Sequence, residues 1–94
     1  MSNWKTQKLK KLAQAFLSIK DEKVMIDFLR DLCTLEELEG ISSRWEVVVL
    51  LGQGMSYRDI ANKTGVSTTT VTRIAHWLNH GQGGYSKVLG SLEV

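Results

Sequence analysis

A run of hydroxyl-bearing side chains, followed by one cation and one imidazole, is the part of this sequence best suited to recognising another molecule. Residues 67–70 are a serine and three threonines, and Thr72, Arg73 and His76 follow them closely. On a helix most of these side chains share one outward face. A threonine offers a hydroxyl and a methyl group, and both can contact base edges in a DNA major groove. The alternative is that residues 67–70 only cap a helix, because Ser and Thr also favour helix N-termini.

The residues around this run have the spacing of a helix-turn-helix element. The segment 55–79 reads MSYRDIANKTGVSTTTVTRIAHWLN, in which Ser56 and Ser67 can each cap a short helix. Gly65 lies where the turn needs a positive φ, and Val66 packs under that turn. This combination is rarer than a Ser/Thr run, so it favours DNA binding over capping alone.

The expected DNA contacts divide into groups that position the protein on phosphates and groups that read bases. The apolar stripe of the second short helix turns inward and consists of Val71, Ile74 and Leu78. The residues predicted to contact DNA are Ser56, Tyr57, Arg58, Lys63, Ser67, Thr68, Thr69, Thr70, Thr72, Arg73 and His76.

The elements that carry these residues must come from one small domain. With 94 residues the chain has room for one core, and 43% hydrophobic with 23% charged residues is typical of a soluble globular protein. No stretch is apolar for long enough to cross a membrane, and residues 1–20 do not read as a secretory signal, so we expect a cytoplasmic protein. One cysteine cannot form an internal disulfide. Without prolines and with few aromatic residues, the composition favours an all-α fold.

Charge is distributed unevenly along the chain. Residues 1–20 carry a net charge of +5, residues 21–46 carry −5, and residues 47–94 carry +2. The basic arm could meet DNA phosphates, whereas the acidic middle must face elsewhere. A solvated helix surface explains the arm equally well. The lysines in question are Lys5, Lys8, Lys10 and Lys11.

The apolar periodicity predicts three helices before the helix-turn-helix element. Amphipathic stripes run through residues 4–19 and 24–32, and Asp21 can cap the second of these helices. Thr34 and Glu37 have the spacing of a capping box, which starts a third helix that ends before Gly52. That helix could be continuous, or it could restart at Ser43. Residues 47–51 are apolar all round, which predicts a central position in the core.

Over nearly its whole length the chain resembles the Trp repressor superfamily, and within it bacterial proteins of the YerC/YecD type. The resemblance rests on FLRDLCTLEEL and on SSRWEVVVLLGQGMSYRDIANKTGVSTTTVTRIAHWLNHGQGGY. It implies an all-helical, intertwined homodimer whose helix-turn-helix elements reach successive major grooves. The parts would be N-terminal dimerisation helices (1–33), a long central helix (34–54), the helix-turn-helix element (55–80) and a C-terminal helix (81–94).

Apolar surface independently favours a homodimer. Two amphipathic N-terminal helices and an all-round apolar segment exceed what one small globule readily covers. A two-fold dimer would bind a palindromic operator with half-sites about 34 Å apart. The alternative is a monomer with an ordinary three-helix core.

The resemblance also implies a corepressor site for tryptophan. The family holds this ligand with two arginines and with contacts near the start of the long helix, and the counterparts here are Arg44, Arg73 and Thr34. This chain departs from the family at two positions of the site, where Ile74 stands in place of a glycine and Trp77 in place of a serine. Both larger side chains would fill space in the ligand pocket. We therefore expect that tryptophan is not the effector and that Trp77 occupies the pocket. A small anionic effector on residues Thr34, Arg44, Arg73 and Trp77 stays open.

The alternative is that neither arginine binds an effector. Arg44 could pair with Glu39 or Glu46, and Arg73 could hold a DNA phosphate.

Other chemistries find little support in the sequence. His76 and His80 have helical metal-binding spacing but no third ligand nearby, so we predict no metal, and no cofactor motif is present. No nucleophile and base arrangement indicates an enzyme. The predicted function is a sequence-specific transcriptional regulator, acting as a repressor and binding double-stranded DNA. The alternative is a helical protein-interaction adaptor that uses the acidic residues 21–46.

Overall fold

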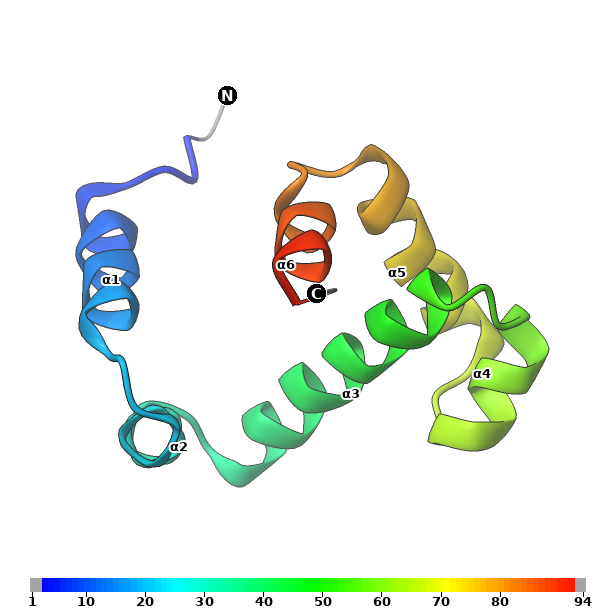
Figure 1. Ribbon diagram of the computed structural model, residues 1–94, viewed down its shortest axis with the longest axis horizontal. Coiled ribbons are helices and arrows are strands. Elements are labelled where there is room, and N and C mark those ends of the chain that lie inside the picture. Colours follow the sequence, from blue (N-terminus) through cyan, green and yellow to red (C-terminus); the bar gives the residue numbers. More distant parts are fainter. Residues whose placement is uncertain (1–2, 93–94) are drawn as a thin grey trace. The chain divides into compact units, whose positions relative to one another are not determined.

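A computed structural model describes residues 3–92, and this part of the chain is all-α, as the sequence predicts (Figure 1). The described residues form six helices and no strand. The helices are α1 (Gln7–Ser18), α2 (Glu22–Leu32), α3 (Leu35–Gly52), α4 (Tyr57–Thr64), α5 (Thr68–His80) and α6 (Gly84–Leu92). None of these helices is long and apolar enough to span a membrane.

The chain divides after Leu38 into two compact units. The first unit contains α1 and α2, whose apolar stripes meet where the rings of Phe16 and Phe28 pack edge to face, with centroids 5.4 Å apart. Neither helix buries a single residue. Leu17, which is 80% exposed, is the extreme case. Both amphipathic helices therefore keep much of their apolar surface accessible within one chain.

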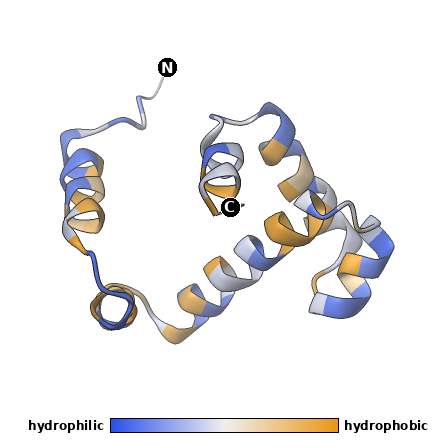
Figure 2. Cartoon of the chain, in the orientation of Figure 1, coloured by the Kyte–Doolittle hydropathy of each residue, from blue (hydrophilic) through white to orange (hydrophobic). Residues whose placement is uncertain are grey.

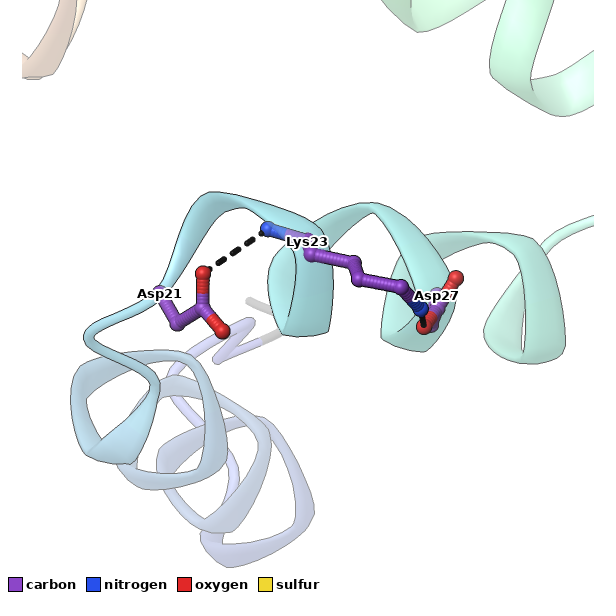
Figure 3. A network of polar contacts seen from close by, with 3 residues as sticks. All are labelled: Asp21, Lys23 and Asp27. Carbon is purple, nitrogen blue, oxygen red and sulfur yellow. Dashed lines mark hydrogen bonds and ion pairs between the residues drawn. The ribbon is translucent and has the colours of Figure 1, made fainter.

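Local hydrogen bonds set the start of each of these two helices. The hydroxyl of Thr6 accepts from Leu9 N at 3.1 Å, so α1 begins at Gln7 rather than at the first residue of the apolar pattern. Asp21 caps α2 as predicted, because its carboxylate accepts from Lys23 N at 3.2 Å. The Lys23 ammonium reaches forward to Asp27 at 2.8 Å, an exposed pair one helical turn apart (Figure 3).

The capping box at the start of α3 is confirmed. Thr34 N donates to Glu37 Oε1 at 2.8 Å, and Glu37 N donates to the Thr34 hydroxyl at 3.1 Å. Hydrogen bonding of the Glu37 carboxylate, first to the backbone and then to the side chain of Thr34, lowers the pKa of Glu37. The helix continues without a break to Gly52, so the restart at Ser43 does not occur. The Ser43 hydroxyl instead donates to Glu39 at 3.3 Å.

The second unit is built around the C-terminal half of α3. Val47 and Val48 are fully buried there, against Ile60 of α4 and Val71 and Ile74 of α5. Figure 2 shows the hydrophobic residues gathered at this end of α3, beside α4 and α5. The central position predicted for residues 47–51 is confirmed, although Val49 and Leu51 stay half-buried. This core fixes both helices of the helix-turn-helix element.

Candidate nucleic-acid interface

The first helix of the element and its turn follow the sequence prediction. The Ser56 hydroxyl accepts from Asp59 N at 3.1 Å and caps α4. At the other end, Gly65 has φ 79° and its N–H donates to Ala61 O at 2.9 Å. This left-handed residue ends α4 and redirects the chain toward α5. Val66 packs against the core, as expected for the residue under the turn.

Thr64 stabilises the turn in a way that the sequence analysis missed. Its hydroxyl donates to Ile60 O at 2.7 Å and accepts from Val66 N at 3.2 Å. One side chain thus joins the last turn of α4 to the residue after the glycine. A threonine directly before a turn glycine was the available signal, because Thr hydroxyls often bond to nearby backbone groups.

The serine and threonine run separates into capping and outward residues. The Ser67 hydroxyl accepts from Thr70 N at 3.1 Å and lies 3.0 Å from the Thr70 hydroxyl. These two side chains therefore satisfy each other at the start of α5, and Thr70 is half-buried. Capping accounts for Ser67 and Thr70, whereas Thr68 and Thr69 are exposed. Capping is thus observed for part of the run, whereas DNA contact by the exposed Thr68 and Thr69 stays a prediction.

The exposed side of α5 forms what we call the threonine face. Opposite it, Val71, Ile74 and Ala75 are buried, so the orientation of the helix about its axis is fixed by the core. The Thr72 hydroxyl donates to Thr68 O at 2.9 Å, which leaves its lone pairs and its methyl group facing out. No acidic residue lies on α5. The threonine face consists of Thr68, Thr69, Thr72, Arg73 and His76, all exposed.

The predicted contacts on α4 are also accessible. Tyr57 and Arg58 lie in its first turn, just after the cap, and Lys63 lies in its last turn. All three are exposed, and neither Arg58 nor Lys63 forms an ion pair within residues 3–92. Because α4 packs against α5, these cations belong to the same unit as the threonine face. The arm lysines are exposed as well, but they belong to the first unit.

Two of the four predicted effector residues meet in a groove of the second unit. Arg44 and Trp77 line an open groove of about 750 Å³, together with Trp45, Val88 and residues 81–85. Trp77 is 43% exposed and forms a wall of the groove rather than filling it. Arg44 makes no ion pair with the neighbouring glutamates described here.

The other two predicted effector residues do not line this groove. Thr34 belongs to the first unit, where its hydroxyl serves the capping box. Arg73 lies on the threonine face, exposed. Joint ligand binding by all four residues therefore stays a prediction.

The groove depends on a glycine whose role the sequence did not reveal. Gly81 N donates to Trp77 O at 2.9 Å and caps α5, and a Cβ added to Gly81 would collide with that carbonyl. The chain then turns through Gly83, which has φ 85°, into α6. Tyr85 packs back toward Trp45, with ring centroids 6.3 Å apart. Residues 81–83 thus form a loop that lines the groove, and α6 begins at Gly84.

Comparisons with known proteins extend over most of the chain. The family model described as Trp repressor protein matches residues 7–93. The uncharacterized protein YerC of Bacillus subtilis (strain 168) is 36% identical over 83 residues, which cover 88% of this chain and 80% of YerC.

Two crystal structures share the fold. A TrpR-like protein from Eubacterium eligens ATCC 27750 is 44% identical, with a TM-score of 0.87, over 94% of this chain and 91% of that one. A candidate Trp repressor from Staphylococcus aureus is 29% identical, with a TM-score of 0.88, over 96% of this chain and 90% of the other.

Proposed function

Because the chain belongs to the Trp repressor family, we propose that it is a transcriptional regulator that binds double-stranded DNA in a sequence-specific manner. The observation that carries this proposal is the threonine face of α5, exposed on one side of a helix that buries Val71 and Ile74 on the other. A helix held in this way, behind a glycine turn, suits insertion into a major groove.

In this proposal, different exposed side chains of α4 and α5 supply the affinity for DNA and the sequence specificity. Arg58, Lys63 and Arg73 are exposed cations that can neutralise phosphates and so supply affinity in any sequence. Thr68, Thr69 and Thr72 offer short donors, acceptors and methyl groups at the start of α5, where base edges come within reach. Methyl contacts would favour thymine at the positions they face.

We further propose that the regulator is a homodimer that represses by occluding a promoter. Support for the dimer comes from α1 and α2, which bury no residue although both are strongly amphipathic. A second copy would cover these stripes and place two threonine faces on one side of the DNA. The operator would then be a palindrome.

Free tryptophan is not the effector in this proposal. Ile74 is almost fully buried in the core, and Trp77 places an indole beside Arg44. The indole of Trp77 in the groove wall leaves less room for an aromatic ligand beside Arg44 than a small side chain would, whereas Ile74 lies in the core and does not line the groove. If an effector acts in this proposal, it is a small anion, because a carboxylate suits guanidinium groups such as those of Arg44 and Arg73. Isothermal titration with tryptophan should give no binding, and micromolar binding would overturn this part of the proposal.

Selection from random DNA duplexes tests the central proposal. The purified full chain should enrich a palindrome, and its affinity should fall by orders of magnitude between about 50 and about 200 mM salt, since counterions are released on binding. Selection that enriches no sequence would contradict specific DNA recognition. If DNA binding is absent altogether, an adaptor role for the acidic residues 21–46 becomes the better explanation.

A further inference from the structure

Two histidines lie one turn apart near the C-terminal end of α5. The ring centroids of His76 and His80 are 5.1 Å apart and the ring planes are inclined by 44°. Both residues are exposed, and neither imidazole forms a hydrogen bond or ion pair with another residue in the described part of the chain. Their ring nitrogens are therefore available to an external partner.

The helix beneath this pair is well anchored. Ala75, directly before His76, is 3% exposed, and Ile74 is 1% exposed. Since α5 carries no acidic residue, no carboxylate on the same helix competes for the imidazoles. Two histidines four residues apart on one helix face are the arrangement with which helical motifs present two nitrogen ligands to one zinc ion.

The sequence predicted no metal because a third ligand is missing, but the close approach of the two rings changes this assessment, and we propose that His76 and His80 together chelate one divalent transition-metal ion on the surface of α5. Imidazole nitrogen favours Cu²⁺, Ni²⁺ and Zn²⁺ over Mg²⁺ and Ca²⁺, which take oxygen ligands. The described residues contain no group of three or more metal-binding side chains, so water completes the coordination. A site with two protein ligands exchanges its ion, unlike the closed four-ligand cage of a structural zinc site.

The position of this chelate connects it with the threonine face. His76 belongs to that face, and Arg73 lies three residues before it. An ion bound there would add positive charge beside the surface that we propose for DNA. This connection rests on the proposed function, whereas binding of the ion to the two histidines does not.

Isothermal titration of the full chain with Cu²⁺ and, separately, Zn²⁺ in the absence of DNA tests the chelate. We expect one ion per chain, with Cu²⁺ bound more tightly than Zn²⁺. His76→Gln and His80→Gln should each weaken binding by about tenfold or more, because two linked ligands reinforce each other. Because both side chains are exposed, the helical circular dichroism of the variants should not change.

A matched control keeps two histidines but separates them. His80→Gln combined with Ser86→His places the second imidazole on α6, and it should bind metal no better than His80→Gln alone. If either single variant binds the metal ion as tightly as the wild type, the chelate proposal is wrong. Loss of DNA binding in a separate experiment would bear only on the proposed function.

Discussion

Thr69 is the side chain on which the proposed readout depends most directly. It is exposed, it lies in the first turn of α5, and no hydrogen bond to the described residues occupies its hydroxyl, whereas the Thr72 hydroxyl donates to the backbone. Replacing it should therefore change DNA contact without a cost to the fold.

We predict that Thr69→Glu weakens operator binding by at least about tenfold, because a good base contact alone contributes roughly 1–3 kcal/mol and the carboxylate adds repulsion from phosphates. An electrophoretic mobility shift titration measures this change. Ser86→Glu, an equal change of charge on α6, is the control and should bind almost like the wild type. Normal operator binding by Thr69→Glu would mean that another surface reads DNA.

Substitution of two glycines, Gly65 and Gly40, should change the stability of the protein in opposite directions. Gly65 has φ 79° with nothing within 4 Å of a built Cβ, so any side chain there meets a backbone penalty rather than a clash. Gly40 lies inside α3 with open space around it. Gly65→Val should destabilise the second unit by about 1–2 kcal/mol or more, because a β-branched residue resists positive φ. Gly40→Ala should stabilise the protein by roughly 0.5–1 kcal/mol. Denaturant unfolding measures both, and equal effects would refute this explanation.

The start of α3 is sensitive to acid. Hydrogen bonds from Thr34 hold the pKa of Glu37 below its ordinary value of 4.5. A carboxylate whose pKa is lowered in the folded state stabilises the protein above the unfolded pKa, and this contribution disappears as the pH falls through the folded pKa.

We therefore predict that Glu37→Gln lowers the thermal midpoint at pH 7 and that the difference from the wild type shrinks below pH 4.5. Glutamine keeps an acceptor for the Thr34 N–H but lacks the charge that favours a helix N-terminus. Glu36→Gln is the control, because Glu36 makes no side-chain hydrogen bond to a described residue. A difference between Glu37→Gln and the wild type that does not depend on pH would contradict the ionic origin of the effect.

The sequence predicted those features that depend on a few neighbouring residues. The caps at Asp21, Ser56 and Ser67 and the turn at Gly65 each follow from one side chain or one φ angle, and all are present. The inward position of the apolar residues of α5 follows from helical period alone.

Features that need two distant segments escaped prediction. The groove beside Arg44 exists because residues 81–85, a loop and the start of α6, return toward α3, where Tyr85 approaches Trp45. Spacing along the chain does not specify such a return, and it does not show that Arg73 lies outside the groove lining. The Thr6 cap lies inside the apolar pattern of residues 4–19, so that pattern alone does not indicate where α1 begins.

The first unit has no buried residue in either α1 or α2, so within one chain these two helices form no closed hydrophobic core. Leu17 is 80% exposed although it lies on the apolar stripe of α1. If a second copy covers this stripe, Leu17→Glu should bring an uncompensated charge into the interface and shift the protein toward monomer. Sedimentation velocity measures the mass. Gln14→Glu adds the same charge at an exposed polar position and should stay dimeric. A dimer that persists in Leu17→Glu would exclude α1 from the interface.

A two-fold dimer also fixes the distance between the two half-sites of the DNA that it binds. Two threonine faces related by a two-fold axis reach one side of the duplex only if the half-sites are separated by about one helical turn, roughly 34 Å. Inserting about 5 base pairs between the half-sites rotates one of them to the opposite side, so affinity should fall toward the non-specific level. The same insertion outside the operator should have no effect. If the protein binds the inserted operator as tightly as the original, each copy reads its half-site alone, and the specificity resides in α4 and α5 of a single chain.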